Sequence, residues 1–144
     1  EPMVAQAREN VRRARPDQRI HIQKAAATEL PFVDNHFDAV VSSGSLHHFK
    51  QATTALDEIH RVLKPGGTAL IYDLVRELPA EVRERLRRKF GTLRMSLLRL
   101  HSFEEPFYDL DEMAALPRST RFGKGETRFV GAMCCLMLTK PDIA

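Results

Sequence analysis

Two apolar strand patterns that flank one amphipathic helix constrain this sequence more than any other feature. The runs Phe37–Val41 and Thr68–Tyr72 are rich in apolar side chains, as strands covered on both faces usually are. Between them, the apolar residues of segment 51–63 recur at helical spacing. A strand, a helix and a second strand in this order predict a crossover unit of a parallel α/β sheet.

The segments around this unit also have readable patterns. The opening residues 1–12 have helical spacing, and Arg19–Lys24 alternates polar and apolar residues, as a half-exposed edge strand does. Segment 79–100 predicts a long helix that Gly91 kinks or divides. The remaining predictions are a helix-like segment over 110–116 and two strands over 121–130 and 131–139, paired by a short turn if antiparallel.

The composition fits one soluble domain over residues 1–144, with 43% hydrophobic and 28% charged residues. The net charge of +3 is scattered along the chain, so nucleic-acid binding is not demanded. No run reaches the ~20 apolar residues of a membrane helix, and no leader pattern opens the chain. We therefore expect a cytoplasmic protein without integral membrane association. The adjacent Cys134 and Cys135 are predicted to pack in the core.

Four short motifs follow one another in the first half of the chain. They are Leu30-Pro31-Phe32, Phe37-Asp38-Ala39-Val40-Val41-Ser42-Ser43, Leu46-His47-His48 and Glu58-Ile59-His60-Arg61-Val62-Leu63-Lys64-Pro65-Gly66-Gly67. In this order and spacing, they resemble the class I S-adenosylmethionine-dependent methyltransferases that act on small molecules, a group that includes quinone-biosynthesis enzymes. The resemblance covers residues 1–75 closely and the remainder in element order only.

The resemblance implies a Rossmann-like α/β fold, a mostly parallel sheet with helices on both faces, here lacking the family's first two strands. Arg19–Gln23 would be the family's third strand, Phe37–Val41 its fourth and Thr68–Tyr72 its fifth. The family's glycine-rich cofactor loop has no counterpart, because the first glycine of the chain is Gly44. The later Gly123-Lys124-Gly125 is not followed by a helix pattern and is predicted to be a turn. The chain is thus expected to be an N-terminally truncated methyltransferase domain.

The resemblance assigns parts of an S-adenosylmethionine site to four small residues. Ala26 and Ala27 follow the predicted third strand, where the family usually has an aspartate for the adenine amino group. Ala26 lacks that acceptor, and such a hydrogen bond is worth about 0.5–1.5 kcal/mol. Ser43 and Gly44 match positions that line the methionine part, with a simple strand-ending turn as the alternative. Without the glycine loop and the family's ribose-binding acid, we expect this chain alone to bind the cofactor poorly.

His47 and His48 are the candidate catalytic residues. The resemblance places them near the transferred methyl group and the acceptor, and histidine can take up a proton near neutral pH. The alternative is that neither acts, because orientation supplies much of the rate of an in-line displacement. Asp73 follows the predicted fifth strand and points towards the same rim, where it is a candidate contact for the acceptor.

Other charged groups have plainer interpretations. Glu58 and Arg61 lie three residues apart on one helix and predict an ion pair, not a site. Segment 79–100 carries basic side chains beside an apolar stripe, so it could lie on an anionic membrane or meet an acidic partner, with a solvated face as the default. Its basic residues are Arg83, Arg85, Arg87, Arg88, Lys89, Arg94 and Arg99. The histidines at 21, 36, 60 and 101 lack metal-ligand spacing, so no metal site is predicted.

The leading hypothesis is S-adenosylmethionine-dependent methyl transfer to a small-molecule acceptor. The alternative is a catalytically inactive methyltransferase-like remnant that serves as an interaction module. A nicotinamide-dependent Rossmann protein is disfavoured, because no dinucleotide loop is present. Without the first strand, the sheet would expose an edge, and exposed edges pair with other chains. We therefore also expect homodimerisation or aggregation through that edge.

Overall fold

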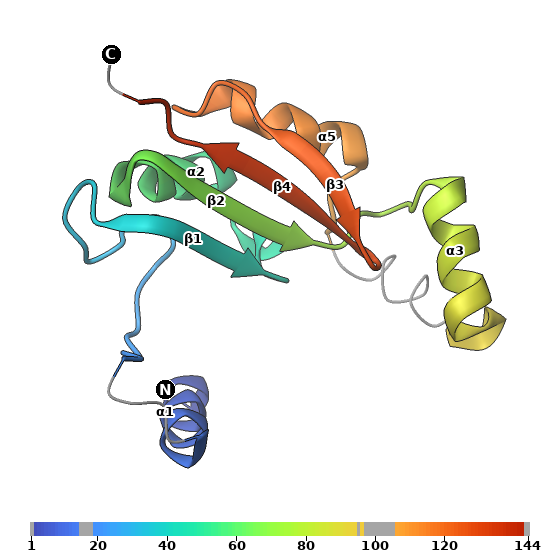
Figure 1. Cartoon of the computed structure of the whole chain (residues 1–144), viewed down its shortest axis with the longest axis horizontal. Helices are drawn as coiled ribbons and strands as arrows, with labels where there is room; N and C mark the ends of the chain where they lie inside the picture. Colours follow the sequence, from blue (N-terminus) through green and yellow to red (C-terminus); the bar gives the residue numbers. More distant parts are fainter. Residues whose placement is uncertain (1, 15–18, 95, 97–105, 143–144) are drawn as a thin grey trace.

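A four-stranded mixed sheet forms the centre of the protein in the computed structural model (Figure 1). The strands are β1 (Phe37–Ser43), β2 (Leu63–Asp73), β3 (Glu126–Val130) and β4 (Met133–Thr139), in the order β1-β2-β4-β3. The β1–β2 pair is parallel, and the β2–β4 and β3–β4 pairs are antiparallel. The structure describes residues 2–14, 19–94, 96 and 106–142.

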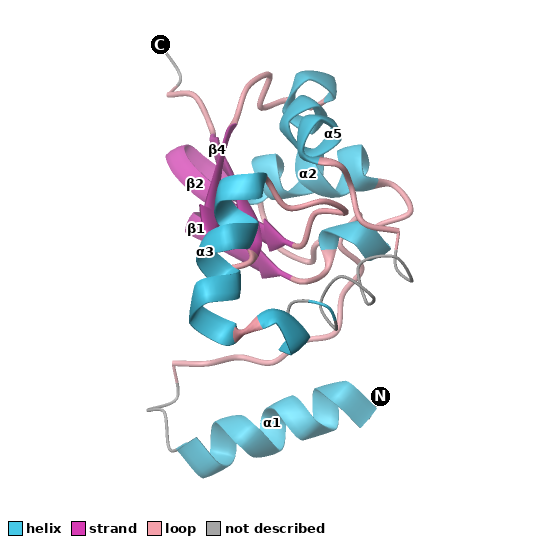
Figure 2. Cartoon of the chain, turned by 90° about the vertical axis from the view of Figure 1, so that its right-hand side faces the viewer, coloured by secondary structure: helices cyan, strands magenta, loops and turns pink. Residues whose placement is uncertain are grey.

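The described helices and 3-10 turns take different places around this sheet. They are α1 (Pro2–Ala14), α2 (Ala52–Val62), α3 (Ala80–Phe90) and α5 (Leu110–Ala115), with the 3-10 turns η1 (Leu46–His48) and η2 (Leu116–Ser119). Figure 2 shows α2 and α5 on the same side of the strands. In Figure 1, α3 lies beyond the end towards which β1 and β2 run, and α1 lies apart from the sheet. No residue of α1 is buried.

The predicted crossover unit is confirmed by β1, α2 and β2. The helix α2 forms because its apolar face has a sheet to cover, and Leu56, Ile59 and Val62 are all buried on it. The chain turns extended at Leu63, and Pro65 follows where a helix could not continue. The strand β2 begins at Leu63, opposite Phe37, and its pairing with β1 is irregular before it resumes at Thr68.

The hydrophobic core lies between the sheet and the helices α2 and α5. Alternate residues of β2 and β4 face it, among them Ile71, Leu136 and Leu138. Cys134 and Cys135 are free thiols that are fully buried, so the prediction that they pack in the core is confirmed. Burial raises the pKa of Cys134 to about 11.

The predictions for the second half of the chain agree with the structure where it is described. The helix α3 ends at Phe90, and Gly91 follows with a φ of 82°, so this glycine divides the predicted helix. Residues 97–100 of that prediction lie outside the described residues. The terminal strands form the antiparallel pair β3–β4, and Gly131 in their turn has a φ of 65°.

The predicted strand at Arg19–Lys24 is wrong. This segment has no regular secondary structure, and only Ile22 within it is partly buried. A strand needs hydrogen bonds from a neighbour, and β1 pairs with β2 alone among the described strands. The Rossmann-like fold class is confirmed. Since no strand forms at Arg19–Lys24 to pair with β1, the described sheet has three strand pairs, and only β1–β2 is parallel.

Candidate functional site

A pocket of about 340 Å³ opens at the carboxyl ends of the two parallel strands. Gly44 follows β1, and Asp73 is the last residue of β2. Open α/β sheets bind ligands at this edge, because the loops after neighbouring parallel strands meet there. The residues that line the pocket are Gly44, His47, His48, Asp73, Leu74, Phe107 and Met133.

A buried carboxylate holds His47 in this pocket. Asp73 is only 1% exposed, and its oxygens accept hydrogen bonds from three donors. These are the His47 backbone N–H at 3.0 Å, the His47 Nδ1 at 2.9 Å and the Leu74 backbone N–H at 2.8 Å. An ionised carboxylate only accepts hydrogen bonds, so this contact matches the neutral tautomer of His47 that has its proton on Nδ1 and an acceptor at Nε2.

Aromatic neighbours fix the plane of the same imidazole. The His47 ring lies 4.3 Å from the Phe107 ring and 3.9 Å from the His48 ring, measured between centroids. Its side chain is 7% exposed, whereas His48 is an exposed residue. Of the two predicted catalytic histidines, His47 is therefore the one held in a single orientation.

The small residues at the end of β1 leave space beside the Asp73–His47 pair. Gly44 has a φ of 61°, and no atom lies within 4 Å of the position that a side chain would take. Its N–H donates to the Tyr72 carbonyl at 2.8 Å, which ties it to β2. Ser43 is exposed, and its carbonyl accepts a hydrogen bond from the Ser45 hydroxyl at 3.1 Å.

Of the other two predicted cofactor residues, only Ala27 lies at a pocket, and it is a different one. Ala27 lines a pocket of about 350 Å³ with Thr28, Phe49, Lys50 and Gln51. Ala26 is exposed and forms an isolated bridge with Glu29. Since Phe49 directly follows His48, the turn η1 connects the two pockets. The structure thus groups Gly44 with both histidines, places Ala27 at the second pocket and leaves Ala26 outside both linings.

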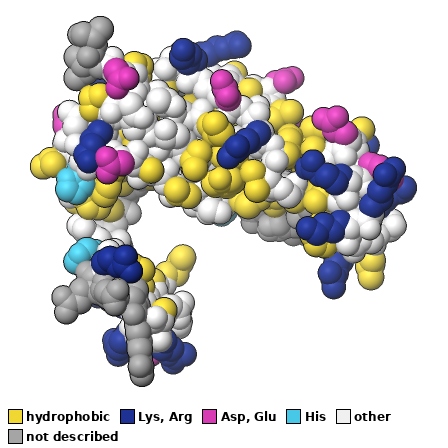
Figure 3. Space-filling model, viewed as in Figure 1, with side chains coloured by type: hydrophobic (Ala, Val, Ile, Leu, Met, Phe, Trp, Pro, Cys, Tyr) yellow, Lys and Arg dark blue, Asp and Glu magenta, His cyan; other side chains and the backbone are white. Residues whose placement is uncertain are grey.

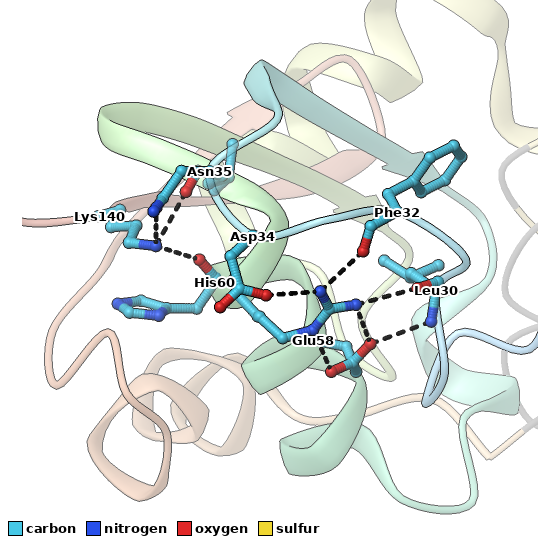
Figure 4. Close-up of polar contacts among 9 residues, drawn as sticks. Leu30, Phe32, Asp34, Asn35, Glu58, His60 and Lys140 are labelled. Atoms are coloured by element: carbon cyan, nitrogen blue, oxygen red, sulfur yellow. Dashed lines mark hydrogen bonds and ion pairs between the residues drawn. The ribbon is translucent and has the colours of Figure 1, made fainter.

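Glu58 and Arg61 form the predicted ion pair, and they also hold the loop before β1 (Figure 4). The Arg61 guanidinium donates to both Glu58 oxygens at 2.8 Å. It also donates to the Leu30 and Phe32 carbonyls at 2.9 and 2.7 Å. Glu58 in turn accepts the Leu30 N–H at 3.0 Å. This clamp fixes the chain directly after the turn that contains Ala27.

The clamp changes the acidity of both partners. Hydrogen bonds from Arg61 and from the Leu30 N–H lower the pKa of Glu58 to about 2. The hydrogen bonds from Arg61 to Glu58 and Asp34 raise the pKa of the guanidinium further above its usual value. A second clamp lies nearby, where Lys140 Nζ donates to the His60 carbonyl at 3.0 Å and to Asn35 at 2.8 Å (Figure 4).

Sequence reasoning placed Asp73 at the rim but missed its bond to His47. The sequence did contain a signal for this bond. His47 and Asp73 lie at the carboxyl ends of two neighbouring parallel strands, and such ends meet at one edge of the sheet. Leu74, Phe107 and Met133 also line the pocket and were not predicted. Within the described ranges, no cluster of three or more His, Cys, Asp or Glu side chains could hold a metal ion. The same ranges contain no helix that is long and apolar enough to cross a membrane.

Comparisons with known proteins find similar sequences among methyltransferases. The sequence family described as "Methyltransferase domain" matches residues 1–71. The chain is 47% identical over 60 residues to a demethylmenaquinone methyltransferase of Clavibacter sepedonicus, a match that covers 42% of this chain and 24% of that protein. It is 34% identical over 119 residues to the O-methyltransferase cnsE of Penicillium expansum, which covers 83% of this chain and 40% of that protein.

The fold is shared with solved methyltransferases. A crystal structure of a SAM-dependent methyltransferase from Aquifex aeolicus superposes with a TM-score of 0.66 at 19% identity. The match covers 97% of this chain and 64% of that one. The chain therefore spans less than half the length of these curated relatives and about two thirds of this solved domain.

Proposed function

We propose that this chain, which has the sequence and the fold of a class I S-adenosylmethionine-dependent methyltransferase domain, serves methyl transfer to a small-molecule acceptor. The observation that carries the proposal is the buried Asp73–His47 pair beside Gly44 at the carboxyl ends of β1 and β2. The relatives named as quinone and O-methyltransferases support a small-molecule acceptor.

The residues that line the two pockets fit the methionine part and the adenine of the family's cofactor. The open space at Gly44 admits close approach of the methionine part, and the hollow at Ala27 and Phe49 offers partly apolar walls for the adenine. In neither pocket does a carboxylate remain for the ribose hydroxyls, because Asp73 is already occupied by its three donors. The described chain thus supplies part of a cofactor site.

The proposed chemistry assigns one step to this chain's own residues. The cofactor supplies an electrophilic methyl group when it is bound. His47 accepts a proton at Nε2 from an acceptor hydroxyl, because Asp73 keeps the ring proton on Nδ1. Asp73 is a positioning residue that also favours the positive charge the ring then carries. Phe107 and Met133 form the apolar wall against which an acceptor packs.

The first test is calorimetric titration of S-adenosylhomocysteine into the purified chain. Micromolar binding that Gly44→Val abolishes and the exposed-site control Val33→Ala retains would support the proposal. No detectable binding by a folded chain would favour the second candidate, an inactive methyltransferase-like module that interacts with other proteins. The single-domain organisation over 1–144 and the cytoplasmic setting remain predictions.

The second test addresses His47 without the cofactor. Long-range ¹⁵N–¹H correlation spectra of the imidazole rings distinguish the two neutral tautomers. We expect His47 to be protonated on Nδ1 and His48 to show the tautomer mixture of an exposed ring. A His47 ring that is protonated on Nε2 would remove the basis for its role as a base.

A further inference from the structure

The helix α3 has an apolar stripe that is buried at one end and exposed at the other. Val82 and Leu86 are 4% and 3% exposed, whereas Phe90 and Leu93 are 43% and 76% exposed. Val82, Leu86 and Phe90 lie on one face of α3, and Leu93 lies in the short helical turn that follows Gly91. The apolar side chains are therefore buried in the first half of α3 and exposed at its C-terminal end and in the turn that follows.

Cationic side chains lie along α3 on both sides of this stripe, from its buried part to its exposed end. Residues 80–90 carry five basic and two acidic side chains: Arg83, Arg85, Arg87, Arg88 and Lys89 against Glu81 and Glu84. Glu84 pairs with Arg87 and Arg88, at 3.1 and 3.0 Å. Arg83 and Arg85 have no acidic partner within the described part of the chain. Figure 3 shows Lys and Arg atoms gathered over α3, with hydrophobic atoms at its lower tip.

We propose that the C-terminal end of α3 docks on an anionic lipid surface, with Phe90 and Leu93 in the headgroup region and Arg83 and Arg85 above it. Interfacial helices bind in this way, with an apolar face inserted and basic residues at its margins. The cation that lies over the Phe90 ring, Lys89 Nζ at 5.2 Å, is a further charge at the same end.

A lipid surface fits these observations better than a nucleic acid does. A phosphate backbone would use the arginines but would leave the aliphatic Leu93 in water. A bilayer accommodates both the basic and the apolar side chains, and it covers Leu93 without a further segment of protein. The docking is peripheral and does not depend on the proposed methyl transfer.

The test is co-sedimentation of the purified full chain with vesicles. One set contains phosphatidylcholine alone, and the other an equal mixture of phosphatidylcholine and phosphatidylglycerol. We expect binding to the anionic vesicles only. The double variant Arg83→Gln, Arg85→Gln should bind them at least tenfold more weakly, since each cation near such a surface contributes about fivefold. Its control is Arg118→Gln with Arg128→Gln, which removes the same charge from exposed sites outside α3.

The apolar contribution is tested separately. Leu93→Ser should weaken binding several-fold, and Val33→Ser, at a loop residue that is 70% exposed, should not. Equal binding to both vesicle types, no binding, or an equal loss in the two arginine variants would overturn the proposal. So would a Leu93→Ser variant that binds unchanged, because the surface would then recognise charge alone, as a nucleic-acid or acidic-protein site does.

Discussion

Replacement of Asp73 by Asn tests the geometry of the site most directly, because the side chain keeps its shape and loses its charge. Asp73 accepts three hydrogen bonds through two oxygens, and it is 1% exposed. An asparagine has one acceptor oxygen, so its amide N–H groups must face at least one buried donor. The loss of charge-assisted bonds and the unsatisfied donor together should destabilise the fold by about 2–4 kcal/mol.

The assay is urea unfolding followed by circular dichroism. With a slope of about 2 kcal/mol per molar, the loss corresponds to a midpoint about 1–2 M lower in urea. Asp38→Asn is the matched control, since that side chain is 86% exposed and accepts a hydrogen bond from Lys64 at the surface. We expect its midpoint to equal that of the parent chain. If the two variants shifted equally, Asp73 would not hold His47 as the structure describes.

Three further predictions use other parts of the chain. Because Arg61 lowers the pKa of Glu58 from 4.5 to about 2, stability from this pair is present above pH 4.5 and is lost as the pH falls towards 2. After screening by solvent it amounts to about 1 kcal/mol, and Glu58→Gln should flatten that part of a stability–pH curve. The buried thiol of Cys134 has a pKa of about 11, so Ellman's reagent at pH 8 should label it only after unfolding. The free edge of β1 should cause self-association in sedimentation analysis, which Val41→Lys should reduce; a monomeric parent chain would refute this.

Local patterns predicted local elements well. The helix predicted over 51–63 occurs at Ala52–Val62, and its apolar face is the one that packs. The strand predicted over 68–72 begins five residues earlier, at Leu63. In this added part, Leu63 pairs with Phe37 of β1 before the register becomes irregular. The early start therefore depends on the partner strand and not on the sequence of β2 itself.

The candidate site was predictable only in part, because it too depends on contacts between segments that are distant in the sequence. Gly44, His47 and Asp73 follow strands whose order is readable, so topology brings them to one edge. Phe107 reaches the same pocket from beyond α3, and no periodicity relates it to the strands. The orientation of His47 depends on that ring and on Asp73, which are separate in the sequence and adjacent only in the fold.

The segment Arg19–Lys24 shows where such reasoning fails, because strand alternation cannot produce a strand without a neighbour. Its residues are mostly exposed, and the nearer edge of the described sheet, β1, pairs only with β2. We expect its backbone amides to exchange with deuterium at the rate of an unstructured peptide. The amides of Leu70 and Tyr72, inside the sheet, should be protected by comparison. Equal protection of both segments would mean that Arg19–Lys24 finds a partner strand in solution, and the most available one is the free edge of β1 in a second copy.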